Sequence, residues 1–381
     1  MRRRHCWPER PRSATFFPHF GKTSAPSGQI WFNRTKYGAL FRMSWLAIWD
    51  GRELTHISDR TRGVDLSQGT VRFEISLRGE IQEPVILWQG RTGTPRDLRI
   101  LCRPDGAVSL EHGPLQFATD PGFVFAGEPI LLHYSWDRDG RADLLSMTNI
   151  QTGADLSLRP GCHAARDLLE IVPETPGPAV SVAYAGLANH PLPTHPLPGL
   201  SGATRLQTPD GEIPLHTLRP GMEVLTASGR RETIRWIGTT QHMARGITAP
   251  VLLRAPYFGL SHDILVSRSQ RIRLSGHEVD YLFGTEQVLA KVEDIRRTNS
   301  AEICLSAPIV ETCHILLDDH DCLLAGRCVL DTNLLGEVLE ASGKSTATLA
   351  SEDLRPAWPV IDRAGAQAYL DMLSQNRRNA A

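Results

Sequence analysis

Apolar residues at every second position dominate the first half of the chain, a pattern typical of β-strands that bury one face. The alternation recurs in segments between Gly69 and Tyr184. One predicted strand places on its buried face Val71, Phe73, Ile75 and Leu77. Arg72 and Glu74 alternate with these residues, and we expect them on the opposite face, away from the core.

Turn residues divide this half into hairpins. Residues 98–102 alternate, the chain reverses at a Pro-Asp-Gly turn at 104–106, and residues 108–110 return. A second hairpin spans residues 130–146, with its turn at 137–140. Strands at this spacing, with no helical pattern between them, predict a sandwich of two antiparallel sheets.

A proline-rich segment separates the two halves. Between Ala188 and Ser201, four prolines remove backbone donors and favour an extended chain, so we expect an exposed linker there. His190 and His195 lie within it. We expect both to be solvated and not to bind a metal, because an extended strand brings no further ligands toward them.

A second β pattern begins directly after this linker. Thr204, Leu206 and Thr208 alternate into a Pro-Asp-Gly turn at residues 209–211, and residues 212–215 begin the return. This arrangement predicts a tight hairpin.

The segment 203–225, with a further strand at 233–237, resembles the opening of a Hint domain, the autoprocessing module of hedgehog proteins and inteins. It is most similar to the bacterial branch, whose members start with a cysteine and continue T-R-[IL]-x-T-P-x-G-x-[IV]-P-x-x-x-L-x-P-G-x-x-V-L-T. The residues that match are Thr204, Arg205, Thr208, Pro209, Gly211, Pro214, Leu218, Pro220, Gly221, Val224, Leu225 and Thr226.

Two later segments resemble further signatures of the same family. Residues 262–273 read HDILVSRSQRIR, close to D-L-x-V-S-P-x-H-R-[IV], with Arg268 at the proline position and Gln270 at the histidine position. Residues 313–326 resemble F-H-[IL]-L-x-D-x-H-x-x-[IL]-x-A-x-G and keep both histidines. The resemblance therefore rests on three separate signatures.

This resemblance implies an acyl shift, in which a side-chain nucleophile attacks the carbonyl of the residue before it. Counting back from Thr204, the family's cysteine falls at Pro198 or Gly199, and neither side chain can attack a carbonyl. The nearest hydroxyl is that of Ser201. Gln270, at the general-acid position, can polarise the reacting group through a hydrogen bond but cannot transfer a proton at neutral pH.

The candidate catalytic residues are therefore Ser201 as a displaced nucleophile, Thr204 and Gln270 within the signatures, and His314 or His320 as base. The structural alternative is favoured: Ser201 as a turn residue, His314 as a strand residue facing the core, and His320 as a turn residue. Replacement of both nucleophile and acid argues against processing, since either loss alone approaches the uncatalysed rate.

The first half resembles a second family. Residues 132–137 (LHYSWD), the Arg-Asp-Gly after them and a strand closing at residues 152–153 are similar to a concanavalin-like or laminin-G-like jelly roll. The resemblance implies a glycan or a protein as partner. Trp88 and Trp136 lie in apolar alternation, so we expect them in the core and not on a sugar-binding face.

Together these patterns predict a mainly β chain with short C-terminal helices, the latter from apolar spacing at 334–339 and 364–375. The expected division is an extension without structure at 1–42, a concanavalin-like β-sandwich (jelly roll) at 43–187, the linker at 188–201, an all-β Hint domain at 202–328 and a helical extension at 329–381. Residues 1–42 are arginine-rich and lack the apolar region of a secretory signal, so we take Met43 as the working start.

Composition adds few constraints. The 381 residues carry a formal net charge of -1, which does not favour nucleic acid or an acidic membrane surface as a partner. No apolar run approaches the ~20 residues that span a bilayer. Seven cysteines, an odd number, indicate reduced thiols and favour the cytoplasm, and the four from Cys304 to Cys328 match no zinc spacing. We expect no cofactor and no metal.

Two functions remain open at this point. In the favoured one, the chain does not process itself and acts as a binding or scaffold protein. In the other, it cleaves itself through Ser201 and releases the sandwich, which would be its only enzymatic activity. A carbohydrate-binding module is a further alternative.

Overall fold

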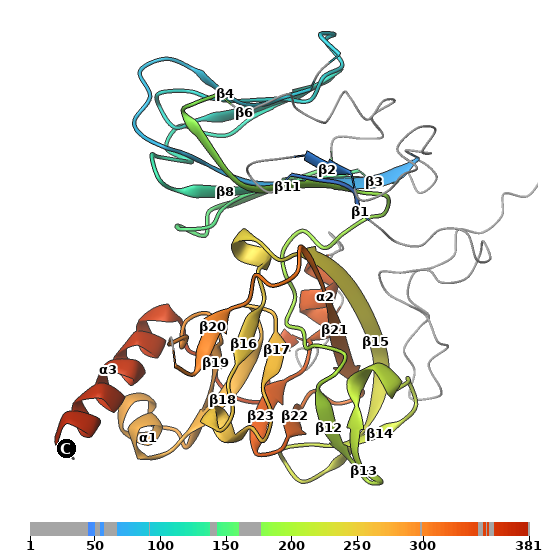
Figure 1. The fold of residues 1–381 in the computed structure, drawn as a ribbon, viewed down its shortest axis with the longest axis vertical. Helices are drawn as coiled ribbons and strands as arrows, with labels where there is room; N and C mark the ends of the chain where they lie inside the picture. Colours follow the sequence, from blue (N-terminus) through green and yellow to red (C-terminus); the bar gives the residue numbers. More distant parts are fainter. Residues whose placement is uncertain are drawn as a thin grey trace, which may run out of the picture.

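The computed structural model describes residues 45–49, 54–56, 67–90, 92–137, 143–159, 177–297, 299–341, 346–347, 349 and 354–379. The chain is mainly β, built from antiparallel sheets with helices toward the C-terminus, so the predicted fold class is confirmed (Figure 1). The predicted extension at 1–42, the hairpin turn at 138–140, Cys6 and Cys162 lie outside the described residues.

Two antiparallel sheets form the N-terminal sandwich. The larger contains Trp45–Trp49 (β1), Leu54–His56 (β2), Gln68–Leu77 (β3), Pro129–Asp137 (β8), Leu144–Asn149 (β9), Asp155–Leu158 (β10) and Val180–Ala188 (β11). The smaller contains Val85–Gln89 (β4), Arg99–Cys102 (β5), Val108–His112 (β6) and Leu115–Ala118 (β7). Their strand orders are β10–β9–β8–β3–β11–β1–β2 and β4–β5–β6–β7. Both predicted hairpins, β5–β6 and β8–β9, are present.

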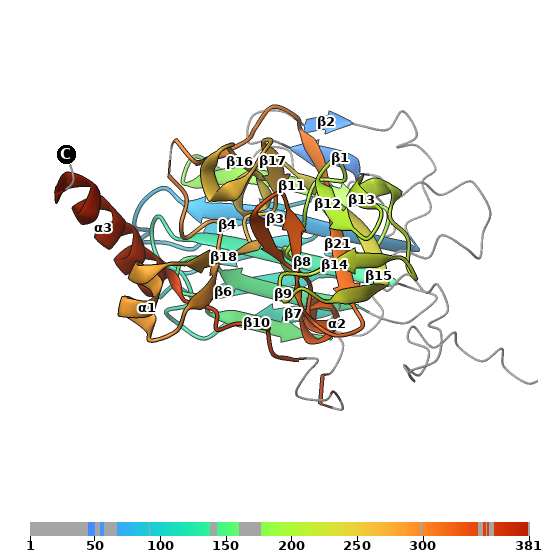
Figure 2. The ribbon, with the colours of Figure 1, turned by 90° about the horizontal axis from the view of Figure 1, so that it is seen from below.

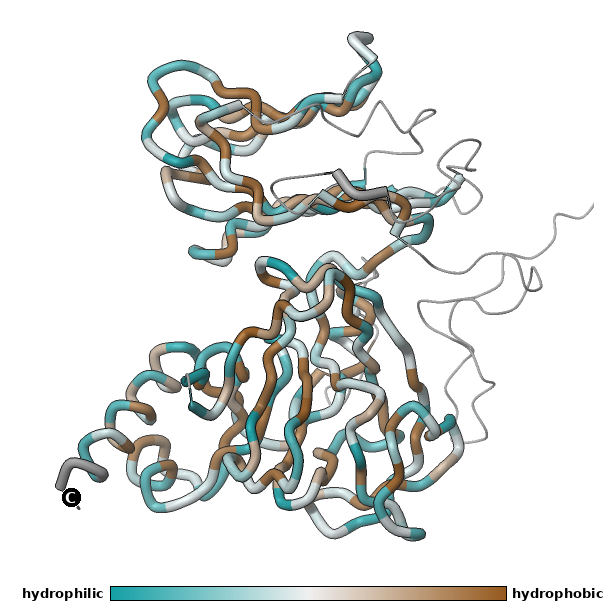
Figure 3. The backbone as a smooth tube through the Cα atoms, viewed as in Figure 1, coloured by the Kyte–Doolittle hydropathy of each residue, from teal (hydrophilic) through white to brown (hydrophobic). Residues whose placement is uncertain are grey.

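The core of the sandwich lies between these sheets. Val71, Phe73 and Ile75 belong to it, and Phe73 contacts Trp88 of the smaller sheet, with ring centroids 3.9 Å apart. Trp88 and Trp136 are 3% and 0% exposed, as expected for core residues. Figure 3 shows the apolar residues concentrated along the strands of both sheets.

The opposite face of the larger sheet is also buried. Arg72 and Glu74 are 1% and 7% exposed, because the C-terminal half of the chain packs against this face. Glu74 accepts a hydrogen bond from the N–H of Ile247 at 2.6 Å. The expectation that only one face is buried is therefore wrong for β3. Alternation separates the two faces of a strand but does not say whether another domain covers the outer one.

The C-terminal half is built from short sheets. Its strands are Arg205–Thr208 (β12), Gly211–Pro214 (β13), Glu223–Leu225 (β14), Arg231–Met243 (β15), Val251–Leu253 (β16), Ile264–Val266 (β17), Arg271–Ser275 (β18), Gln287–Lys291 (β19), Ala301–Ile303 (β20), Ile309–Leu317 (β21), Cys322–Ala325 (β22) and Cys328–Asp331 (β23). The predicted hairpin is β12–β13, in which Thr208 pairs with Gly211 across a two-residue turn. The sheets are β12–β13, β14–β15–β21, β17–β16–β20 and β19–β18–β23–β22.

Three α-helices are present in the described residues: His277–Phe283 (α1), Leu335–Ala341 (α2) and Arg363–Asn379 (α3). The last two lie where apolar spacing predicts helices, whereas α1 was not predicted. Figures 1 and 2 show α1 and α3 side by side at one end of the molecule. None of the helices in the described part is long and apolar enough to cross a membrane.

The segment between the two halves is packed. Leu192 and Leu197 are 2% and 1% exposed, and His190 is 7% exposed. The expectations of an exposed linker and of a solvated His190 are therefore wrong, while His195 is exposed as expected. The leucines between the prolines supply apolar surface that both halves bury, which the proline content alone did not reveal.

Hydrogen bonds tie the same segment to each half. The Thr70 hydroxyl of β3 donates to the carbonyl of His190 at 2.8 Å. The N–H of Thr194 donates to the carbonyl of Ala341, at the end of α2, at 2.9 Å. The linker is therefore part of the contact between the two halves.

Gly246→Ala tests that contact. Gly246 has φ +53, and a Cβ there would overlap the Glu74 carboxylate. Gly229→Ala is a matched control, because Gly229 has φ +81 and no atom within 4 Å of such a Cβ. We expect the control to lose about 1–2 kcal/mol of unfolding free energy from the left-handed backbone alone, and Gly246→Ala to lose more, as measured by urea unfolding. Equal losses would contradict the contact.

Candidate functional site

The junction between the halves lies as a strand between β17 and β21. Leu200 exchanges two backbone hydrogen bonds with Cys313 of β21, at 2.9 and 2.7 Å. On the other side, the N–H of Ser201 donates to the carbonyl of Leu265 of β17 at 2.8 Å. Pairing on both sides fixes the peptide bond 198–199 just before it.

The carbonyl of Pro198 is held by two side chains. His314 Nδ1 lies 2.7 Å from it, and Asn333 Nδ2 donates to it at 3.0 Å. Because a carbonyl only accepts, Nδ1 carries the ring proton, and Nε2 accepts from the hydroxyl of Thr240 at 3.0 Å. Two convergent donors on one buried carbonyl are an arrangement that stabilises the oxyanion of acyl transfer.

Burial keeps this part of the site uncharged. It lowers the pKa of His314 to about 4, although the bond to Pro198 acts in the opposite direction. His242, whose ring centroid is 6.4 Å from that of His314, is also buried. Burial and the proximity of His314 lower the pKa of His242 well below its ordinary value of 6.5. Both rings are therefore neutral at physiological pH.

Gly199 leaves no room for a nucleophile at the junction. A Cβ at this position would lie 2.9 Å from His314 Cε1 and 3.0 Å from Thr312 Cβ, closer than such atoms normally approach. The backbone is also held, since the N–H of Ser267 donates to the Gly199 carbonyl at 2.9 Å. The His314 ring thus occupies the space beside the junction that a side chain at 199 would need.

Comparison with known proteins identifies this region. Residues 198–337 match the family model described as Hint domain. This part of the chain is a Hint domain. The match begins at Pro198, one residue before the glycine where the junction lacks a side chain. Among curated proteins, no sequence matches the chain.

Some solved structures show low likeness. The MchDnaB-1 intein has 12% identity and a TM-score of 0.24, over 35% of this chain and 99% of the intein. The CBM40 of the Ruminococcus gnavus IT-sialidase, solved with α2,3-sialyllactose, has 15% identity and a TM-score of 0.25, over 39% of this chain and 94% of its own. The Trypanosoma rangeli sialidase has 13% identity and a TM-score of 0.22, over 33% of this chain and 21% of its own. At these values, the likenesses carry no argument about activity or ligands.

The side chain of Gln270 does not bind at the junction but to two carbonyls inside the Hint domain. It is 1% exposed, and its Nε2 donates to the carbonyls of Arg271 and Asp331, each at 2.9 Å. The expectation that Gln270 polarises the junction is therefore wrong. His314 and Asn333 provide the two donors instead.

Sequence reasoning missed Asn333. Its Oδ1 accepts from the N–H of Ile315 at 3.0 Å, and its own N–H donates to the Ile315 carbonyl at 2.9 Å, so its side chain is fixed on β21. Asp331 and Thr332 before it are also buried polar residues. A polar run that begins at the last residue of β23 was the available signal, but it belongs to none of the three signatures.

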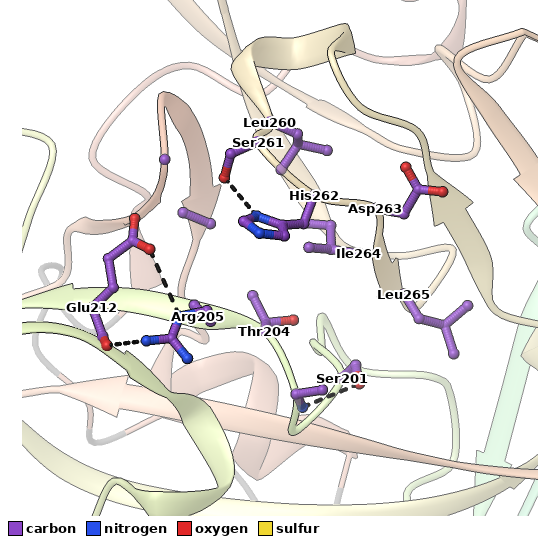
Figure 4. Close-up of a pocket in the computed structure, with 13 residues that line it drawn as sticks. Ser201, Thr204, Arg205, Glu212, Leu260, Ser261, His262, Asp263, Ile264 and Leu265 are labelled. Atoms are coloured by element: carbon purple, nitrogen blue, oxygen red, sulfur yellow. Dashed lines mark hydrogen bonds and ion pairs between the residues drawn. The ribbon is translucent and has the colours of Figure 1, made fainter.

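Ser201 lies at a pocket and makes a local turn. Its Oγ accepts from the N–H of Ala203 at 3.3 Å. The pocket, of about 150 Å³, is also lined by Thr204 and His262 (Figure 4). Thr204 is buried, and its hydroxyl makes no hydrogen bond within the described part of the chain. Charged lining residues are ion-paired: Arg205 with Glu212, and Asp263 with Arg254.

Neither candidate base has a nitrogen available for Ser201. His320 Nε2 lies 3.1 Å from Asp331 Oδ1, and its Nδ1 accepts from the N–H of Ala357 at 3.1 Å. His314 uses both nitrogens as described above. The structure therefore brings His314 to the Pro198 carbonyl but does not assemble Ser201 with a base.

The described cysteines are structural in character. All five are free, and four of them, including Cys313 and Cys328, are buried. Burial raises the pKa of Cys313 to about 11 and that of Cys328 to about 12, which keeps both thiols protonated and poorly nucleophilic. Within the described ranges, no group of His, Cys, Asp and Glu is arranged to hold a metal ion.

His314→Gln should flatten the dependence of stability on pH. In the folded protein, the pKa of His314 is about 4 instead of 6.5, so the unfolded chain binds more protons between these values. Stability from this group is complete above pH 6.5 and falls as pH drops toward 4, by roughly 3 kcal/mol in total. Glutamine does not titrate, and its amide can still donate to Pro198.

Urea unfolding at several pH values across this window measures the effect. We expect His314→Gln to lose less unfolding free energy than the wild type as the pH falls. His277→Gln, at an exposed position, is the matched control and should follow the wild type. Parallel curves for His314→Gln and the wild type would rule out the buried neutral imidazole.

Proposed function

We propose that the protein is a non-processing binding or scaffold protein, in which the Hint domain serves as a platform for the β-sandwich. The observation that carries this proposal is the junction at Gly199. It has no side chain to attack the Pro198 carbonyl, and the His314 ring stands where one would go. We also place this Hint domain in the bacterial branch and the sandwich among concanavalin-like or laminin-G-like jelly rolls, on the sequence signatures alone.

The chain lacks the nucleophile and the general acid of the acyl shift. Without a nucleophile at 199, the two donors on the Pro198 carbonyl have no tetrahedral intermediate to stabilise. Without the histidine at 270, no acid in register protonates the departing nitrogen, a loss that typically costs ~10²- to 10⁴-fold in rate.

Both departures from the second signature have structural partners. Arg268, at the family's proline position, donates to the Gly246 carbonyl at 2.7 Å and pairs with Glu293 at 2.8 Å. Gly246 belongs to the turn that receives Glu74 of the sandwich. Gln270 binds two carbonyls within the Hint domain. Arg268 therefore supports the segment on which Glu74 docks, and Gln270 has a structural role inside the Hint domain; neither contact serves chemistry at the junction.

The alternative is self-cleavage at Leu200–Ser201. The Leu200 carbonyl accepts a strand hydrogen bond from Cys313 at 2.7 Å and not the bonds of His314 and Asn333. Among the described histidines none is hydrogen-bonded to Ser201, and His262, which lines the same pocket, is bonded to Ser261 instead. The two donors, His314 and Asn333, bind the Pro198 carbonyl, whereas the Ser201 hydroxyl would have to attack the Leu200 carbonyl. Because the donors and the hydroxyl serve different peptide bonds, the structure argues against this function.

A glycan or protein that binds the sandwich would bind at the smaller sheet. The larger sheet is covered by the Hint domain, whereas Ile86, Gln89 and Gln116 of the smaller sheet are exposed. Trp88 and Trp136 are committed to the core, so a glycan would have to bind without stacking on them.

Intact-mass measurement tests the absence of processing. We expect the purified chain to keep its full mass after prolonged incubation with hydroxylamine or a strong thiol, and Ser201→Ala to behave identically. Gly199→Cys supplies a thiol in register, and it should also stay intact because no acid is present. Gly199→Ala is the matched control for the crowding that both substitutions cause. Cleavage of the wild type that Ser201→Ala abolishes would overturn the proposal.

A further inference from the structure

A layer of ionisable side chains is buried where the larger sheet meets the Hint domain. Arg72 of β3 and His133 of β8 are 1% and 0% exposed. His190 in the linker and His242 of β15 are 7% and 3% exposed. Such side chains are rarely buried together, so their protonation bears directly on whether the domains stay docked.

Arg72 lies at the centre of this layer. It donates to Nδ1 of His133 at 3.1 Å and also to the carbonyl of Pro193 in the linker. A guanidinium has donors only, so Nδ1 of His133 carries no proton. Nε2 of His133 has no partner among the described residues. A protonated His133 would therefore place donor against donor and cation against cation, with no acceptor in the described part to compensate.

We propose that the contact between Arg72 and His133 is an acid-sensitive latch, which holds the linker on the larger sheet at neutral pH and lets the sandwich separate from the Hint domain when His133 is protonated.

Several titratable groups surround this latch. The titratable groups that face it are Tyr184 on β11, His195 in the linker and His242 in the Hint domain, with His314 next to His242. Around His195 lie three carboxylates, Asp155, Glu337 and Glu340.

Glu74 is the carboxylate on the same face of β3. It is bonded to Ile247 and lies near Arg268 of the Hint domain, with Glu293 beyond. Burial raises its pKa, so it loses its negative charge early as the pH falls. The interface then retains the charge of Arg72 and gains positive charge from the histidines.

The direction of the pH effect follows from burial. Desolvation and Arg72 lower the pKa of His133 well below 6.5, and burial lowers that of His190 to about 4. The docked state therefore binds fewer protons than a separated state with solvated rings, so docking is complete above pH 6.5 and weakens as the pH falls below it. For one such histidine, the separation constant rises about thirtyfold by about pH 5.

This inference goes beyond the proposed function, because it concerns docking and holds whether or not the chain processes itself. Hydrogen exchange on the full chain, at about pH 7.5 and about pH 5 and corrected for intrinsic rates, tests it. We expect amides of residues 189–197 to exchange at least tenfold faster in acid, while amides of β5 and β6 in the sandwich core stay protected. Intact mass of the same samples separates opening from cleavage.

Two variants assign the effect to the latch. His133→Asn keeps an acceptor for Arg72 but does not titrate, and Arg72→Gln removes the cation; either should reduce the acid response of the linker severalfold. His277→Asn, at an exposed position, should leave it unchanged. If His133→Asn fails to fold, Arg72→Gln alone decides. Equal linker protection at both pH values, simultaneous loss of protection in β5 and β6, or a full acid response in the folded variants would each overturn the proposal.

Discussion

Backbone hydrogen bonds hold Leu200 and Ser201 between β17 and β21, and the positions of the neighbouring groups depend on these bonds. They hold the junction in a single position, and that position places the Pro198 carbonyl against His314 and Asn333. The linker before the junction packs between the two halves, with Leu192 buried on the larger sheet and Leu197 buried against the C-terminal half. A looser junction would leave two tethered domains, whereas this one produces a single packed body with polar groups enclosed at its centre.

Burying these polar groups costs desolvation free energy. Hydrogen bonds offset this free energy more fully at the junction than on the larger sheet. The Pro198 carbonyl and the Asn333 amide are matched to partners, so their desolvation is offset. Among the described residues, the guanidinium of Arg72 bonds only to neutral acceptors, one of them a histidine that must stay unprotonated. Both arrangements therefore depend on a histidine that stays neutral, His314 at the junction and His133 on the sheet, but only on the sheet does a protonated ring face a cation.

Local patterns in the sequence predicted the elements that depend on local contacts. The alternation of β3 and the turn of the β12–β13 hairpin are readable because each is specified within ten residues or so. Helix α1 was not predicted, because seven residues between two glycines are too few to show a helical period of apolar residues. The burial of Arg72 and His190 and the role of Asn333 arise from segments far apart in the chain, and spacing carries no information about them. Gln270 stands at the histidine position of the second signature, but where its amide points depends on Asp331, sixty-one residues later.

The strand-like setting of Leu200 also has a mechanical consequence. Tension applied between the sandwich and the body of the Hint domain enters along the chain at residues 199–201, parallel to β17 and β21. Hydrogen bonds to both neighbours would then be loaded together in shear, instead of opening one at a time as at a free edge. The junction would behave as an anchor under load, and extension would have to begin in the linker upstream of it.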